Sequence, residues 1–173
     1  MRKVEVCPYN EQWVSMFEEE ASKLSDIFGE EIVVIEHIGS TSVPGLKAKP
    51  IIDIMPVVKD INMVDKYNKA MQDMGYEPKG ENGIPNRRYF QKGGDNRTHH
   101  VHIYQFGNDG IQRHLAFRDY LIAYPEAKKK YGELKQQLSQ QFPYDIQSYI
   151  LGKENLVKEI ERLAIDWYKE NQK

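Results

Sequence analysis

Residues 35–58 read Ile-Glu-His-Ile-Gly-Ser-Thr-Ser-Val-Pro-Gly-Leu-Lys-Ala-Lys-Pro-Ile-Ile-Asp-Ile-Met-Pro-Val-Val, and this stretch decides the fold. It continues the apolar, β-branched run at 32–35, which predicts a buried strand. Turn-forming residues follow as far as Pro50. A second apolar run at 51–58 then predicts another strand, and one charged residue, Asp53, stands inside it. A carboxylate in an apolar strand is costly unless something pairs with it, so Asp53 indicates a functional site.

The turn after the first strand supplies groups that suit a phosphate. Gly39 lets the backbone approach a ligand closely, because it has no side chain. Ser40 and Thr41 add hydroxyl groups and backbone N–H groups, which match phosphate oxygens. We therefore predict a phosphate-and-metal pocket at the ends of two neighbouring strands, with Asp53 as the metal ligand.

The segment from Glu36 to Leu46, followed by Lys49-Pro50-Ile51-Ile52-Asp53-Ile54, resembles the signature of the GrpB family. That family is similar to the nucleotidyltransferase superfamily, which carries a Gly-Ser pair after one strand and an Asp-x-Asp or Asp-x-Glu on the next. The resemblance also includes Pro8-Tyr9-Asn10 before Trp13, His100-Val101-His102, the segment from Phe117 to Leu121, Tyr131 with Leu134-Lys135, and Tyr149 with Lys153. It therefore covers nearly the whole chain.

The resemblance implies an α+β (α/β-like) fold with a nucleotidyltransferase-type mixed sheet of about five strands. Helices would pack on this sheet, and a C-terminal helical segment would follow it. The resemblance further implies a nucleotide or other phosphate ligand, a divalent metal (Mg, Mn or Zn) and the transfer of a nucleotidyl group. The acceptor and the substrate stay open.

Met55 departs from the superfamily pattern, because it occupies the position of the second carboxylate. A thioether does not bind Mg²⁺, which prefers oxygen ligands. Three functions therefore stay open: a metal-dependent nucleotidyltransferase, a catalytically degenerate nucleotide-binding protein, and a metal-dependent phosphohydrolase. If only the ligand is missing, Met55→Asp is expected to restore it on the same strand face as Asp53.

The segment Thr98 to Phe106 predicts a strand on which His100 and His102 point to one face and His99 to the other. Two imidazoles on one face chelate a transition metal or, when protonated, hold a phosphate. The alternative is an exposed polar face. The resemblance places this strand beside that of Asp53, so we predict that Asp53, His100 and His102 share a metal site. Imidazole favours Mn²⁺ or Zn²⁺ over Mg²⁺.

Other polar residues have a functional and a structural interpretation. His37 precedes the Gly-Ser turn, as a general acid or base or as a half-buried strand residue. Lys49 can reach the Asp53 carboxylate or a phosphate, or it is a surface lysine. Arg88 is predicted to clamp a phosphate; Arg87 would face the other way, so at most one of them enters the pocket.

Tyr149 and Lys153 lie one helical turn apart. The resemblance implies that Tyr149 stacks on a base and that Lys153 contacts phosphate, whereas the alternative is a structural pair. The candidate site is then Asp53, Ser40 and His37 for catalysis; Gly39, Ser40, Thr41, Lys49, Arg88, Tyr149 and Lys153 for the nucleotide or phosphate; and Asp53, His100 and His102 for the metal.

The rest of the chain predicts a single domain over 1–173, with the sheet core at about 1–110 and a helical part at about 111–173. Helices are expected at about 62–74, 111–123 and 126–141, with a last one that begins near 144 and is interrupted at Gly152. Trp13 and Phe17 recur at helical spacing, which favours core packing over a stacking platform for a base.

The composition narrows the possible partners. A net charge of −2 gives no bulk attraction to nucleic acid or to an anionic membrane. The single cysteine, Cys7, allows no intrachain disulfide. Neither a signal-peptide-like segment nor a membrane-spanning run is apparent. A cytoplasmic protein with a phosphate-bearing small molecule as its partner is therefore expected.

Overall fold

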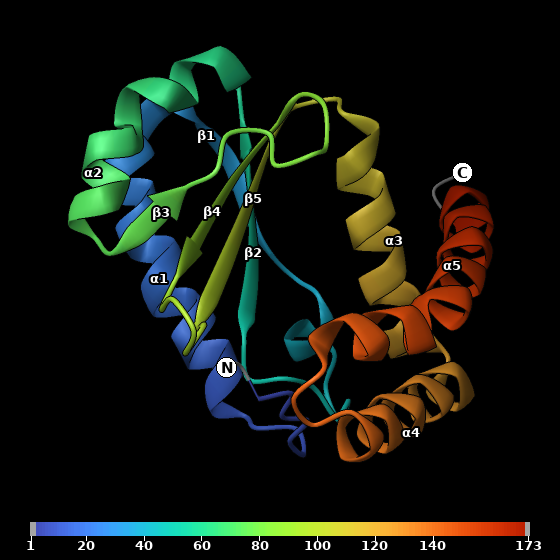
Figure 1. The fold of residues 1–173 in the computed structure, drawn as a ribbon. Coiled ribbons are helices and arrows are strands. Elements are labelled where there is room, and N and C mark those ends of the chain that lie inside the picture. The colour runs from blue at the N-terminus through green and yellow to red at the C-terminus, as the bar shows by residue number, and fades with distance from the viewer. Residues whose placement is uncertain (1–2, 172–173) are drawn as a thin grey trace.

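The computed structural model describes residues 3–171, and a five-stranded sheet forms its centre (Figure 1). Its strands are β1 (Ile32–Ile38), β2 (Ile52–Val58), β3 (Tyr76–Pro78), β4 (Arg87–Lys92) and β5 (His99–Gln105), in the spatial order β1-β2-β5-β4-β3. β2 and β5 are parallel, and the other neighbouring pairs are antiparallel. The predicted mixed sheet of an α+β fold is confirmed.

Strand β1 lies at the edge of the sheet and pairs only with β2. Val33 and Val34 are consequently 45% and 40% exposed, so the prediction of a buried strand at 32–35 was wrong. An apolar β-branched run fits a strand, but it does not distinguish an edge strand from a central one. The central strand is β2, in which every residue except Asp53 is buried.

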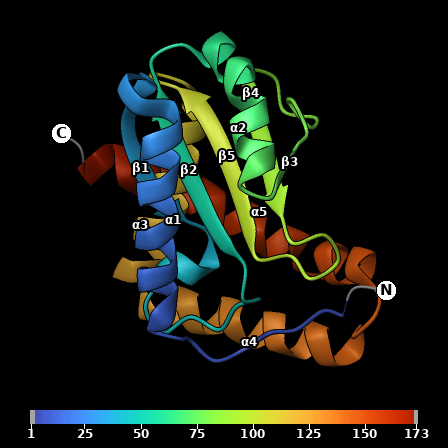
Figure 2. The same cartoon turned by 90° about the vertical axis from the view of Figure 1, so that its left-hand side faces the viewer.

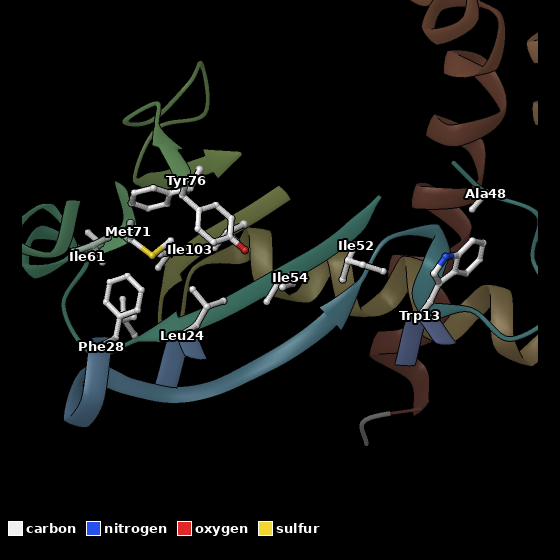
Figure 3. Close-up of a cluster of buried hydrophobic side chains, with 14 residues drawn as sticks. Trp13, Leu24, Phe28, Ala48, Ile52, Ile54, Ile61, Met71, Tyr76 and Ile103 are labelled. Carbon is white, nitrogen blue, oxygen red and sulfur yellow. The ribbon is translucent and has the colours of Figure 1, made fainter. Parts of the chain in front are cut away.

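Helices α1 (Gln12–Phe28) and α2 (Asn68–Asp73) cover one face of the sheet (Figures 1 and 2). Figure 3 shows the core between them and the strands, in which Trp13, Leu24 and Phe28 of α1 are buried. Trp13 is 3% exposed and is therefore part of the core, as its spacing indicated. The helix expected at about 62–74 begins as a 3₁₀ segment, Ile61–Tyr67, before α2.

Helices α3 (Asp109–Ala123), α4 (Pro125–Gln141) and α5 (Ile146–Asn171) form the predicted C-terminal helical segment. α3 and α5 lie across from the other face of the sheet, and α4 lies beyond one end of the strands (Figures 1 and 2). α5 continues through Gly152, so the predicted interruption was wrong. A Cβ at Gly152 would overlap Leu138 of α4, which means that glycine allows close helix packing there. Within residues 3–171, no helix has the length and apolar character needed to cross a membrane.

Candidate functional site

The parallel pairing of β2 with β5 places Asp53 directly beside His100. The carboxylate Oδ1 of Asp53 lies 3.4 Å from His100 Nδ1 and 3.1 Å from His102 Nε2. Burial alone would raise the pKa of Asp53, but the hydrogen bonds that it accepts from His100 and His102 outweigh burial and hold it well below its ordinary value. The three side chains that the strand alternation grouped together therefore form one cluster.

This cluster offers one carboxylate oxygen and two imidazole nitrogens, all within 4.8 Å of one another. That spacing and donor set fit a divalent transition metal such as Mn²⁺ or Zn²⁺ better than Mg²⁺, which demands a shell of oxygens. Two arginines contact the ring nitrogens of these histidines that do not face Asp53. Arg87 Nη1 lies 3.4 Å from His102 Nδ1, and Arg97 Nη1 lies 3.2 Å from His100 Nε2.

Only glycine fits at position 39, because the Asp53 side chain occupies the space that a Cβ would need. The φ of Gly39 is +73°, in the left-handed region that favours glycine, and a Cβ there would overlap the Asp53 carboxylate. We expected a ligand to approach Gly39 closely, but the group that does so is the Asp53 side chain on the neighbouring strand β2. Gly39 fixes the carboxylate beside the turn that carries Ser40.

Gly39→Ala should displace the Asp53 side chain and lower the free energy of unfolding by about 1–3 kcal/mol, from backbone strain and overlap together. Chemical denaturation measures the loss. Gly80→Ala is the matched control, because Gly80 also has a positive φ (+59°) but no atom within 4 Å of its Cβ position. Equal losses in the two variants would contradict the overlap with Asp53.

A cavity of about 150 Å³ opens beside Ser40 and Asp53, and three lysines, Lys49, Lys135 and Lys153, line it. Lys135 of α4 is only 2% exposed and donates a hydrogen bond to Ser40 Oγ at 2.8 Å. Burial lowers the pKa of Lys135 well below its ordinary value, and the charges of Lys153 and Lys49 lower it further. Burial also lowers the pKa of Lys153, against the opposing charge of Asp53.

Tyr149 forms the inner wall of this lysine cavity. The ammonium groups of Lys49 and Lys153 lie 5.1 and 5.0 Å from the centre of its ring. The ring is fully buried, so the prediction that Tyr149 stacks on a base was wrong. Its hydroxyl is buried without a hydrogen-bond partner among residues 3–171. A buried hydroxyl of this kind usually has a partner, which here would be an ordered water or a group of a ligand.

A second cavity, of about 490 Å³, lies between the sheet and α3 and α5. It shares Ser40, Asp53 and Lys153 with the lysine cavity. Phe117, Ile150, Leu151 and Val157 give it apolar walls.

His114 of α3 also lines the larger cavity and was not identified from the sequence. Its ring centre lies 5.6 Å from that of His102, and its Nε2 lies 3.3 Å from the Tyr104 hydroxyl. Burial lowers the pKa of His114 to about 3, so this imidazole is neutral at physiological pH. The sequence of α3 has no periodic pattern that would distinguish His114 from a surface residue.

The structure does not bring Arg88 to the site. Arg88 pairs with Asp65 at 2.8 Å on the opposite face of the sheet, so its predicted role as a phosphate clamp was wrong. Of the two neighbouring arginines, Arg87 is the one on the face of His102. The pairing of Tyr89 with His102 sets this orientation, because alternate residues of a strand share a face.

His37 also faces away from Asp53, because the residue paired with Asp53 on β1 is Ile38. Its ring stacks on Phe17 of α1 at 4.7 Å, and its Nε2 lies 3.0 Å from Thr41 Oγ1. Burial lowers the pKa of His37 to about 4. His37 therefore holds the Gly-Ser turn in place through Thr41, and the predicted acid–base role beside the phosphate is wrong on geometry. The Thr41 hydroxyl is buried in this contact.

Comparison with known proteins identifies close relatives. A model of the GrpB protein family matches residues 3–163. The UPF0157 protein YqkA of Bacillus subtilis is 53% identical over 168 residues, which are 97% of this chain and 49% of YqkA. The glutamate-rich protein GrpB of Alkalihalophilus pseudofirmus is 36% identical over 157 residues, 88% of this chain and 90% of that protein. This chain therefore spans about half the length of one relative and most of the other.

A solved structure is also close to this fold. The crystal structure of the conserved protein GrpB from Enterococcus faecalis has a TM-score of 0.92 and 48% sequence identity. The match covers 95% of this chain and 99% of that one.

Proposed function

The chain belongs to the GrpB family, and from its site we propose that it binds a nucleotide or another organic phosphate. The phosphate groups lie in the lysine cavity among Lys49, Lys135 and Lys153. The organic part of the ligand lies in the larger cavity beside α3 and α5. The resemblance to nucleotidyltransferases points to the same ligand class.

Buried Lys135 carries this proposal. An ammonium group out of water costs several kcal/mol unless an anion compensates it. Among the described residues that line the lysine cavity, Asp53 is the single carboxylate, and it is already engaged by two histidines. A phosphate would offset the charge of Lys135 and accept hydrogen bonds from the lysines. The unpartnered hydroxyl of Tyr149 provides one more group for it.

The arrangement of the two cavities favours an organic phosphate over a free anion as the ligand. They meet at Ser40, Asp53 and Lys153, so one molecule can occupy both. Apolar side chains such as Phe117 and Val157 favour a ring system over a hydrated ion. Nucleotides combine a polyphosphate with such a ring system.

A divalent metal forms the second part of the proposal, with Asp53, His100 and His102 as the residues that would hold it. When bound, it would supply positive charge to phosphate oxygens beside the cavity. Ser40, held by Lys135, would orient the nearest phosphate. Because Met55 replaces the second carboxylate, we favour nucleotide binding over nucleotidyl transfer.

Isothermal titration with adenosine, ATP, UTP and inorganic tripolyphosphate, in the presence of Mn²⁺ or Zn²⁺, tests the proposal. We expect ATP or UTP to bind at least about tenfold more tightly than adenosine, because charge-assisted contacts add 1.5 kcal/mol or more. Lys153→Met should weaken this binding, whereas Lys158→Met, on the exposed side of the same helix, should not. If no triphosphate binds with either metal, the phosphate assignment fails.

A further inference from the structure

Each ring of His100 and His102 has an inner nitrogen beside Asp53 and an outer nitrogen that faces a guanidinium group. The contact with the guanidinium group fixes which of the two nitrogens carries the proton. Arginine has only donors, so an imidazole nitrogen that contacts it must accept. His102 Nδ1 accepts from Arg87, and His100 Nε2 accepts from Arg97. In a neutral imidazole the proton is then on the other nitrogen. Both N–H groups consequently point at Asp53 Oδ1.

The two arginines are themselves anchored. Arg87 is 6% exposed and donates to the carbonyl oxygens of Glu81 and Asn82 at 3.2 and 3.0 Å. Its guanidinium also lies 4.9 Å from the centre of the Tyr89 ring. Arg97 donates to the Gly94 carbonyl at 3.0 Å, which ties it to the turn between β4 and β5. These contacts hold the guanidinium groups against the histidines.

We propose that Arg87 and Arg97 are positioning residues that fix the tautomers of His102 and His100 and thereby weaken the affinity of the Asp53 cluster for transition metals. A metal needs the lone pair of the inner nitrogen. Ligating histidines usually donate the outer N–H to an acceptor, which orients the ring. Here the displaced proton would sit on the outer nitrogen and face another donor.

The inference about affinity rests on the proposed metal site, whereas the tautomer assignment does not. ¹⁵N NMR of the metal-depleted protein reads the tautomers directly from the imidazole shifts and couplings. We expect His102 as the Nε2–H form and His100 as the Nδ1–H form. The opposite forms would overturn the inference and leave the phosphate cavity unaffected.

Metal titration of two Arg97 variants tests the consequence for affinity. Arg97→Gln supplies an amide oxygen that can accept from His100 Nε2–H, whereas Arg97→Met removes the guanidinium donor and its charge without supplying such an acceptor. Because outer partners change metal affinity by about 10–100-fold, we expect Arg97→Gln to bind Co²⁺ and Zn²⁺ at least about tenfold more tightly than the parent, and more tightly than Arg97→Met.

Absorption bands of Co²⁺ and calorimetry provide the readout for these titrations, and Arg162→Gln, on the exposed face of α5, is the control. An unchanged affinity in Arg97→Gln, or equal gains in the Gln and Met variants, would overturn the role of the hydrogen bond. If neither parent nor variant binds either ion, the inference about affinity fails, while triphosphate binding to the lysine cavity is measured separately.

Discussion

Lys135→Met should remove nucleoside triphosphate binding and at the same time make the protein more stable. Methionine fills a similar volume without a charge, and replacing a buried ion by an apolar residue is neutral or stabilising by about 1–4 kcal/mol. Binding should weaken at least about hundredfold, because the phosphate loses a buried charge-assisted partner. The same residue would thus be costly for folding and necessary for the ligand.

The pH dependence of the free energy of unfolding tests whether the buried ammonium group of Lys135 causes the lower stability of the parent. Burial lowers the pKa of Lys135 in the folded protein below the value of about 10.4 for a free lysine side chain. Between these two values the unfolded chain binds more protons, so the stability of the parent should rise with pH in that window. The cost is fully present below the folded-state pKa. Lys135→Met should lose this rise.

Denaturation curves at several pH values, together with calorimetric titration of ATP, measure both effects. Lys130→Met, on the exposed side of the same helix, is the control. A Lys135→Met variant that is less stable than the parent at every pH would show that the ammonium group stabilises the fold. A variant that binds ATP as tightly as the parent would remove the main support for the phosphate cavity.

Strand alternation, together with the family resemblance that placed the two strands side by side, predicted the centre of this site. In a strand, alternate side chains share a face, so Asp53 on β2 and His100 with His102 on β5 could be grouped once the two strands were neighbours. Alternation also showed that Arg87 and Arg88 could not both enter. It did not decide between them, because the register of β4 against β5 depends on a turn and on packing far away in the sequence.

The helical half of the site was harder to predict. Lys135 lies four residues after inward-facing Tyr131, one helical turn further along α4, and a charge on an apolar helix face was the available signal. His114 had no such signal, because its contacts with His102 and Tyr104 depend on how α3 approaches the sheet. Long-range packing of this kind is not encoded in a local pattern.

Met55→Asp is expected to destabilise the protein strongly, and it is not expected to restore the metal ligand that the sequence pattern suggested at this position. Met55 is fully buried in an apolar cluster with Ile38, Val57 and Tyr104, against which Ile111 and Leu115 of α3 pack. It lines neither cavity beside Asp53. An unpaired carboxylate there costs several kcal/mol, a large part of the 5–15 kcal/mol that holds a typical domain folded.

Two measurements separate this outcome from the repair of a missing ligand. Met55→Leu conserves volume and should cost less than about 1.5 kcal/mol, so the difference between the two variants reports the buried charge. Burial would raise the pKa of the new carboxyl above about 3.9, and the variant should therefore lose stability as pH rises through that range and regain it on acidification. Mn²⁺ should not stabilise it, because α3 closes the position. If Met55→Asp were as stable as Met55→Leu and bound Mn²⁺ more tightly than the parent, the second carboxylate position would be open to the metal, and nucleotidyl transfer would become the better proposal.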